Sequence, residues 1–327
     1  MSVDFFDFYW EYHGHTPEHL DAAHAALLAS KGGAEEEPGF IYFIGDSSLD
    51  NKHWLLPGTR KLRSRSISPA CNGWEGVIAQ GRMLEDVAYW LNAAIAAREA
   101  AAALGEASPL PRPLAAINCA VEESTVGARN GGVLLPQDAW CGEHLTGRDT
   151  LVVSVGGNDI ALRPSMSTIG NMATMLVLNS RESIEAVQRG GRLPFGMAHF
   201  VELFGARIQE YVLAVLARRG GGSGGALPRR IIVCMIYFLD EQPGGSWADG
   251  TLKMLGYNTN PAKLQALIRK IFELATEAIE IEGTEVVGMP LFDVLDGKDT
   301  SDYVARVEPS SAGGRKMANA LLDCVLA

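Results

Sequence analysis

Short apolar runs rich in β-branched residues recur along the chain, and each is bounded by glycine, proline or polar residues. The runs cover Phe40–Ile44, Leu114–Cys119, Thr150–Val155, Arg230–Tyr237 and Glu285–Met289. Runs of this length and composition are typical of buried strands. The pattern therefore predicts five strands in the interior of the molecule.

Longer segments between these runs carry apolar residues at helical spacing. They cover Trp74–Leu104, Met197–Arg219, Pro261–Glu282 and Ser311–Val325. Asn260 is placed to cap the third helix before a proline at its first position, and Ser310 is placed to cap the fourth. The sequence therefore predicts four long helices.

Strands that alternate with helices imply right-handed crossovers and a parallel sheet with helices on both faces. We therefore expect a flavodoxin-like three-layer α/β/α sandwich with a five-stranded parallel sheet. Ligands of such sheets bind at the carboxyl ends of the strands. Residues that directly follow a predicted strand are thus the first candidates for chemistry.

The chain has 327 residues, of which 47% are hydrophobic and 20% charged. This composition provides for a large core and carries no mark of disorder. The length fits one large α/β domain. We expect a single domain over residues 1–327, in which residues 1–37 form an N-terminal helical extension packed on the rest.

The formal net charge is −11, and no run of lysine or arginine offsets it. Such a charge repels phosphate backbones, so we expect no nucleic-acid partner. Five cysteines without metal-ligand spacing favour reduced thiols over a disulfide framework. The aromatic, acidic N-terminus does not resemble a secretory signal, and the apolar stretches are too short to span a bilayer. We expect a cytoplasmic protein with no membrane span and no cofactor.

Two turns that follow predicted strands carry candidate chemistry. The first strand leads into Gly45–Asn51, with the sequence GDSSLDN, and the third leads into Gly156–Asp159, with the sequence GGND. A serine on a tight strand-to-helix turn, such as Ser47, has an exposed hydroxyl with backbone N–H groups around it. Asn158 can donate a hydrogen bond to an oxyanion, and the adjacent glycines let the backbone approach a ligand closely.

Together, in this order and at strand ends, the two turns closely resemble the first and third conserved blocks of the SGNH (GDSL-like) hydrolase superfamily. The resemblance extends over nearly the whole chain and implies that family's fold. It also implies that Ser47 is the nucleophile and that Asn158 and the Ser47 N–H hold an oxyanion. The turns and pocket around them would comprise Gly45, Asp46, Gly157 and Asp159.

Two other blocks depart from the family pattern. After the second strand, in residues 118–125, the usual oxyanion glycine corresponds to Glu123. Its N–H can still donate if the backbone adopts the turn, but its carboxylate opposes an oxyanion unless it is turned away or protonated. Before the last helix, residues 302–310 resemble the family's Asp-x-x-His-Pro-Ser segment. There Ala305 replaces the triad aspartate and Glu308 replaces the histidine.

A serine needs a neighbouring base to attack at neutral pH. Glu308 is the candidate by position, and burial with Glu122 or Glu123 nearby would raise its pKa towards the working range. Alternatively, Glu308 is a carboxylate at a helix start, paired with Arg306 or Arg163. Histidine could also serve as the base. The candidates are His53, six residues beyond Ser47, and His144 and His199.

Two groups of residues raise the question of a metal site. The first comprises His13, His15, Glu18, His19 and His24, which lack a recognised ligand pattern. The second comprises Asp46, Glu122, Glu123, Asp159 and Glu308, which could converge on a cation such as magnesium. Aspartates in such turns commonly anchor their own loops instead. We therefore expect no metal.

The leading hypothesis is a divergent SGNH-type serine hydrolase with an atypical triad and weak, esterase- or lipase-like activity on an ester or acyl group. Ser47 would be the nucleophile, Glu308 the base, and Asn158 with the Ser47 and Glu123 N–H groups the oxyanion hole. The irregular segment Phe238–Tyr257 would form a lid or pocket wall. The alternative is a catalytically inactive relative that binds a ligand or assembles with a protein partner.

Overall fold

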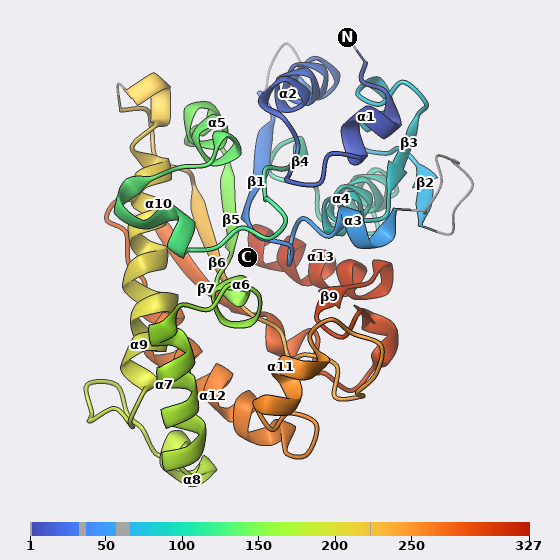
Figure 1. Ribbon diagram of the computed structural model, residues 1–327. Coiled ribbons are helices and arrows are strands. Elements are labelled where there is room, and N and C mark those ends of the chain that lie inside the picture. Colours follow the sequence, from blue (N-terminus) through green and yellow to red (C-terminus); the bar gives the residue numbers. More distant parts are fainter. Residues whose placement is uncertain (1, 33–36, 57–65, 223) are drawn as a thin grey trace.

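A sheet of five parallel strands forms the centre of the molecule. The computed structural model describes residues 2–32, 37–56, 66–222 and 224–327 (Figure 1). In spatial order the strands are β4 (Leu114–Asn118), β1 (Gly39–Gly45), β5 (Thr150–Ser154), β6 (Arg230–Met235) and β7 (Glu285–Pro290). Every neighbouring pair is parallel. All five predicted strands are confirmed, with ends that differ by at most two residues.

Successive side chains of a strand enter different hydrophobic cores on the two faces of the sheet. In β1, Ile41 and Phe43 contact one core and Tyr42 contacts the other. The first core is covered by α4 (Val87–Ala103) and α13 (Ser311–Leu326), and the second by α2 (Pro17–Lys31), α5 (Pro136–His144), α10 (Ile208–Leu216) and α12 (Pro261–Leu274). This layering confirms the predicted three-layer α/β/α arrangement.

Two of the four predicted helices are shorter than their apolar patterns suggest. The helix predicted from Trp74 begins only at Val87, because the Asp86 carboxylate caps it by accepting a hydrogen bond from the Tyr89 N–H at 2.7 Å. The helix predicted to reach Glu282 ends at Leu274, where the backbone leaves the helical region. Both patterns extended into neighbouring non-helical or short 3-10 segments, and into β3 in the first case, which also bury apolar residues.

The other predicted helices agree closely with the structure. Residues 197–216 form α9 (Met197–Glu202), a π-helical turn (Leu203–Arg207) and α10 in succession, and α13 begins where expected. Shorter elements add to this framework: α1 (Phe5–Tyr9), α3 (Lys52–Leu55), α6 (Gly157–Ala161), α7 (Met166–Leu178), α8 (Arg181–Glu185), α11 (Asp249–Met254), and two hairpins, β2 (Ile67–Pro69) with β3 (Arg82–Leu84) and β8 (Tyr303–Val304) with β9 (Glu308–Pro309).

The strand order places β1 between β4 and β5, so the direction in which the sheet grows reverses at β1. The carboxyl ends of β1 and β5 therefore flank the topological switch point, where ligands bind in open α/β sheets. Ser47 lies in the turn after β1, and Asn158 lies in the turn after β5. The fold thus brings the two strongest sequence candidates to the same end of the sheet.

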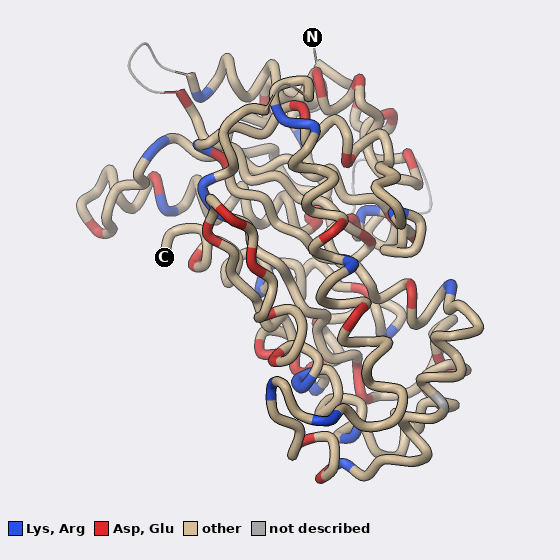
Figure 2. The backbone as a smooth tube through the Cα atoms, turned by 90° about the vertical axis from the view of Figure 1, so that its left-hand side faces the viewer, with Lys and Arg blue, Asp and Glu red and all other residues tan. Residues whose placement is uncertain are grey.

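Charge is spread over the molecule. Figure 2 shows lysine and arginine singly or in small groups in several parts of the backbone, among more numerous acidic residues. Within the described ranges, no helix combines the length and the apolar character needed to cross a membrane.

Candidate active site

The turn that carries Ser47 is built on two features of the neighbouring residues. Gly45 has a φ of +130°, and a Cβ atom there would lie 1.8 Å from the Ser154 carbonyl oxygen, so only glycine fits. The Asp46 carboxylate accepts hydrogen bonds from the Ser48 N–H at 3.0 Å and the Ser48 hydroxyl at 2.8 Å. It also accepts one from the Gly156 N–H at 3.2 Å. Asp46 therefore joins the turn after β1 to the turn after β5.

Ser47 and Glu308 are in direct contact although 261 positions separate them. The Ser47 hydroxyl donates a hydrogen bond to Glu308 Oε1 at 3.3 Å, and both residues are buried. Glu308 lies on β9, which pairs with β8. The Asn51 side-chain amide donates to the Pro309 carbonyl oxygen at 2.9 Å and so connects the two segments a second time.

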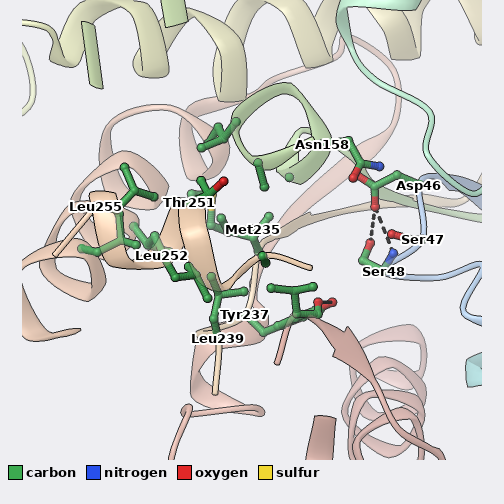
Figure 3. A pocket seen from close by; sticks show the side chains of 18 of the residues that line it. Asp46, Ser47, Ser48, Asn158, Met235, Tyr237, Leu239, Thr251, Leu252 and Leu255 are labelled. Carbon is green, nitrogen blue, oxygen red and sulfur yellow. Dashed lines mark hydrogen bonds between the residues drawn. The ribbon is translucent and has the colours of Figure 1, made fainter. Parts of the chain in front are cut away.

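Asn158 lies in the first turn of α6, directly after Gly157. Its side-chain amide donates one hydrogen bond to the Ser124 carbonyl oxygen at 3.0 Å, which leaves its second amide hydrogen for another acceptor. Asp159 accepts hydrogen bonds from the N–H groups of Val126 and Gly127, both at 2.8 Å. Asp159 thus anchors the turn after β4, and Asn158 faces the pocket that Ser47 also lines (Figure 3).

Glu123 adopts the backbone conformation that glycine favours, with a φ of +59°. Its carboxylate accepts a hydrogen bond from the Tyr12 hydroxyl at 3.0 Å and pairs with the Arg163 guanidinium at 2.8 Å. Glu123 itself does not line the pocket of Ser47. The negative charge at this position is therefore turned away from that pocket and compensated.

Burial dominates the electrostatics of Glu308. Loss of solvent raises the pKa of its carboxyl to about 8, and the nearby carboxylates of Asp46 and Asp50 add to the increase. The hydrogen bond from Ser47 acts in the opposite direction. Glu308 therefore carries a proton at neutral pH in most molecules and becomes a base as the pH approaches 8.

A second buried carboxyl, that of Glu122, lies close to Glu308. Burial, followed by repulsion from Glu308 and Asp50, raises the pKa of Glu122 to about 9. The Trp54 indole N–H donates to Glu122 Oε1 at 3.1 Å. The Oε2 atoms of Glu122 and Glu308 are both buried, and neither has a hydrogen-bond partner among the described residues. Two protonated carboxyls at this depth avoid the cost of two adjacent buried charges.

A buried ion pair lies behind the Ser47 turn and is not evident from the sequence. Lys52 Nζ contacts both carboxylate oxygens of Asp50, at 2.7 and 2.8 Å, and neither side chain is exposed to solvent. Asp50 also accepts a hydrogen bond from the Glu122 N–H at 2.9 Å. In sequence, an aspartate and a lysine two residues apart resemble an ordinary surface turn. Only the complete burial of both, which the tertiary structure creates, distinguishes them.

The structure places the alternative bases away from the pocket. His53 packs against the rings of Tyr12 and Trp54, His144 stacks on Trp140, and His199 contacts the Thr168 hydroxyl at 3.0 Å. Of the residues that the structure describes, no histidine lines the pocket that contains Ser47 and Glu308.

The sequence left open that Glu308 is a carboxylate at a helix start that pairs with Arg306 or Arg163. In the structure both arginines have other partners. Arg163 pairs with Glu123, and the Arg306 guanidinium pairs with Asp249 at 2.6 Å. Arg306 also donates to Asn258 Oδ1 at 3.1 Å. Glu308 is therefore paired with neither arginine.

The two sets of possible metal ligands do not assemble. In the part of the chain that the structure describes, no group of three or more His, Cys, Asp or Glu residues is arranged to hold a metal ion. Asp46 is engaged by its own turn, Asp159 by the N–H groups of Val126 and Gly127 after β4, and Glu123 by Arg163. In the N-terminal set, the buried His15 ring contacts the Phe8 carbonyl oxygen at 2.9 Å.

The predicted pocket wall in the segment Phe238–Tyr257 is present. Trp247, Thr251 and Leu252 from this segment line the pocket of Ser47. The wall is joined to the segment that carries Glu308, because the Ser246 hydroxyl donates to the Ala305 carbonyl oxygen at 2.5 Å. The candidate site thus includes residues from both halves of the chain.

Comparisons with known proteins give weak similarity to esterases. No family model matches the chain, and no curated protein matches it in sequence. A carbohydrate acetylesterase from Sinorhizobium meliloti is 13% identical, with 88% of this chain and 98% of that chain covered and a TM-score of 0.43. An acetylxylan esterase from Geobacillus stearothermophilus is 13% identical, with coverages of 87% and 93% and a TM-score of 0.37. An extracellular lipase from Streptomyces rimosus is 10% identical, with coverages of 87% and 99% and a TM-score of 0.36. Likeness at this level does not establish a family.

Proposed function

We propose that this protein is a divergent SGNH-type serine hydrolase that acts on an ester or acyl group. One observation carries the proposal: the Ser47 hydroxyl donates a hydrogen bond to Oε1 of the buried Glu308 side chain in a pocket that Asn158 also lines. A nucleophile in contact with a base, beside a donor for an oxyanion, is the arrangement that acyl transfer requires.

The proposed reaction uses Glu308 first as base and then as acid. Glu308 takes the Ser47 proton while the oxygen attacks the ester carbonyl, and the resulting oxyanion is held by the Asn158 amide and the Ser47 N–H. The Glu123 N–H is not assigned to the oxyanion hole, because Glu123 does not line the pocket. Collapse breaks the bond to the leaving alcohol, which receives the proton from Glu308. Water then attacks the acylated serine by the same route, and the free acid leaves.

A fluorophosphonate probe tests whether Ser47 is a nucleophile. Attack by the serine oxygen forms a stable phosphorus–oxygen bond and expels fluoride, so we expect one label on the wild type and none on Ser47→Ala. Ser48→Ala is the matched control, since the Ser48 hydroxyl is already bonded to Asp46 and Ser154. Intact-mass spectrometry measures the labelling. Equal labelling of wild type and Ser47→Ala would refute the assignment.

The raised pKa of Glu308 predicts how hydrolysis depends on pH. The base must be ionised, so kcat/KM for an aryl ester should rise about tenfold per pH unit below the pKa of about 8 and level off above it. The measurement is a profile of initial rates in buffers of constant ionic strength. A profile that is flat through the neutral range would show that Glu308 is not the base.

A catalytically inactive binding protein is the second candidate function. Its supporting observation is that Glu308, in the position of the family's histidine, is mostly protonated at neutral pH, while Ala305 replaces the aspartate. This alternative predicts neither labelling nor ester turnover up to the pH at which Glu308 is ionised. A small ester-like ligand or a protein partner would then use the same scaffold.

A further inference from the structure

The pocket of Ser47 is polar at one end only. Its polar end is formed by the turns after β1 and β5 together with Glu308. Figure 3 shows Ser47 and Asn158 on one side of the pocket and Leu252 and Leu255 of the α11 region on the other. The site therefore continues well beyond the atoms that the proposed reaction needs.

The rest of the pocket is lined almost entirely by hydrocarbon. The elements α6, α7, α9, α11 and α12 and the π-helical turn all contribute apolar side chains, among them Met172, Phe200, Leu252, Leu264, Leu267 and Ile271. Tyr237 presents mainly its ring, because its hydroxyl donates to the Val307 carbonyl oxygen at 2.7 Å. Beyond the polar end, no lysine, arginine or carboxylate among the described residues lines the pocket.

We infer that this apolar extension binds an unbranched acyl chain of about six or more carbons, with the carbonyl carbon at Ser47. The inference rests on the proposed function for the position of the carbonyl, but it makes an independent claim about binding. An acetyl group would fill only the polar end, leaving the walls from α11 and α12 without a partner. A sugar or a charged acyl group would bury hydroxyls or charge against side chains that offer no hydrogen bonds.

Neutral alkanols test the binding claim without any catalysis. They are suitable because a fatty acid would place its carboxylate beside Asp46 and Glu308. Trp247 lines the pocket and is 43% exposed, so its fluorescence should report occupancy. Titration of the full-length Ser47→Ala protein with 1-butanol, 1-hexanol, 1-octanol and 1-decanol should give saturable changes. Affinity should rise about fourfold for each added methylene until the pocket is full.

Two substitutions on α11 locate the bound chain. Thr251→Phe adds bulk where Figure 3 shows Thr251 at the pocket, on the side away from Ser47. This substitution should weaken the binding of 1-decanol at least tenfold and leave the affinity for 1-butanol unchanged. Met254→Phe is the matched control, because Met254 is 74% exposed and does not line the pocket. Thermal unfolding checks that both variants are folded.

The outcomes separate this inference from the proposed function. Chain-length-dependent binding to Ser47→Ala supports the acyl pocket even if the wild type hydrolyses nothing. Turnover of short aryl esters, with affinities that do not grow with alkanol length, overturns the acyl pocket and leaves the hydrolase proposal standing. Equal effects of Thr251→Phe and Met254→Phe on 1-decanol also overturn it, because the chain would then lie elsewhere.

Discussion

We expect Glu308→Gln to lower kcat/KM for an aryl ester by roughly a hundredfold to ten-thousandfold, the usual contribution of a general base, if the proposed hydrolysis takes place. Glutamine keeps the size of the side chain but cannot take the Ser47 proton. The rise of activity towards the pKa of about 8 should disappear with it. Initial rates from neutral to mildly alkaline pH, with the protein at high concentration, measure both effects.

Glu122→Gln is the matched control for this substitution. Glu122 is also buried, but its pKa of about 9 means that it is still mostly protonated when Glu308 loses its proton. A neutral glutamine imitates that state, so the rate near pH 8 should change by less than about threefold. If Glu308→Gln retained full activity instead, Glu308 would not be the base.

Lys52→Met lowers the free energy of unfolding by about 3–5 kcal/mol, because it leaves the Asp50 carboxylate buried without its partner. Both side chains are completely excluded from solvent, so water cannot replace the lost contact. Urea denaturation followed by far-UV circular dichroism measures the change. Lys31→Met is the control, since its pairing with Glu99 is partly exposed and should contribute less than about 1 kcal/mol.

The double variant Asp50→Asn with Lys52→Met tests the cause. Removing both charges together should restore most of the stability that Lys52→Met loses, since no unpaired charge then remains in the interior. If the double variant were as unstable as the sum of the two single variants, packing rather than charge would explain the loss.

The strands could be predicted because each is a short, continuously apolar run between polar boundaries. The positions of Ser47 and Asn158 in the candidate site could be predicted for a related reason, because the turns that carry them directly follow two of those runs. Helix ends were harder to predict, as α4 shows, because the apolar residues from Trp74 onward are buried in turns and in strand β3 before the cap at Asp86. The α7 helix was not predicted, although Met166, Ile169 and Met172 follow helical spacing.

The electrostatic character of the site could not be predicted from sequence. Glu308 could be predicted from sequence as a candidate base, but its pKa depends on how deeply β9 is covered and on which carboxylates face it. Likewise, the burial of Lys52 depends on segments distant in the chain. Local composition predicts neither the pKa of Glu308 nor the burial of Lys52, because both arise from long-range packing.

The contact between Ser47 and Glu308 joins an early segment of the chain to a late one. During synthesis, a polypeptide that ends after β7 contains all five strands of the central sheet but not yet Glu308, the partner of Ser47. The site is therefore completed only when β9 docks against the turn after β1. Local unfolding of either segment breaks the contact between Ser47 and Glu308 before the central sheet unfolds. Any activity that needs this contact thus depends on the integrity of nearly the entire molecule, from its first sheet strand to the segment before its last helix.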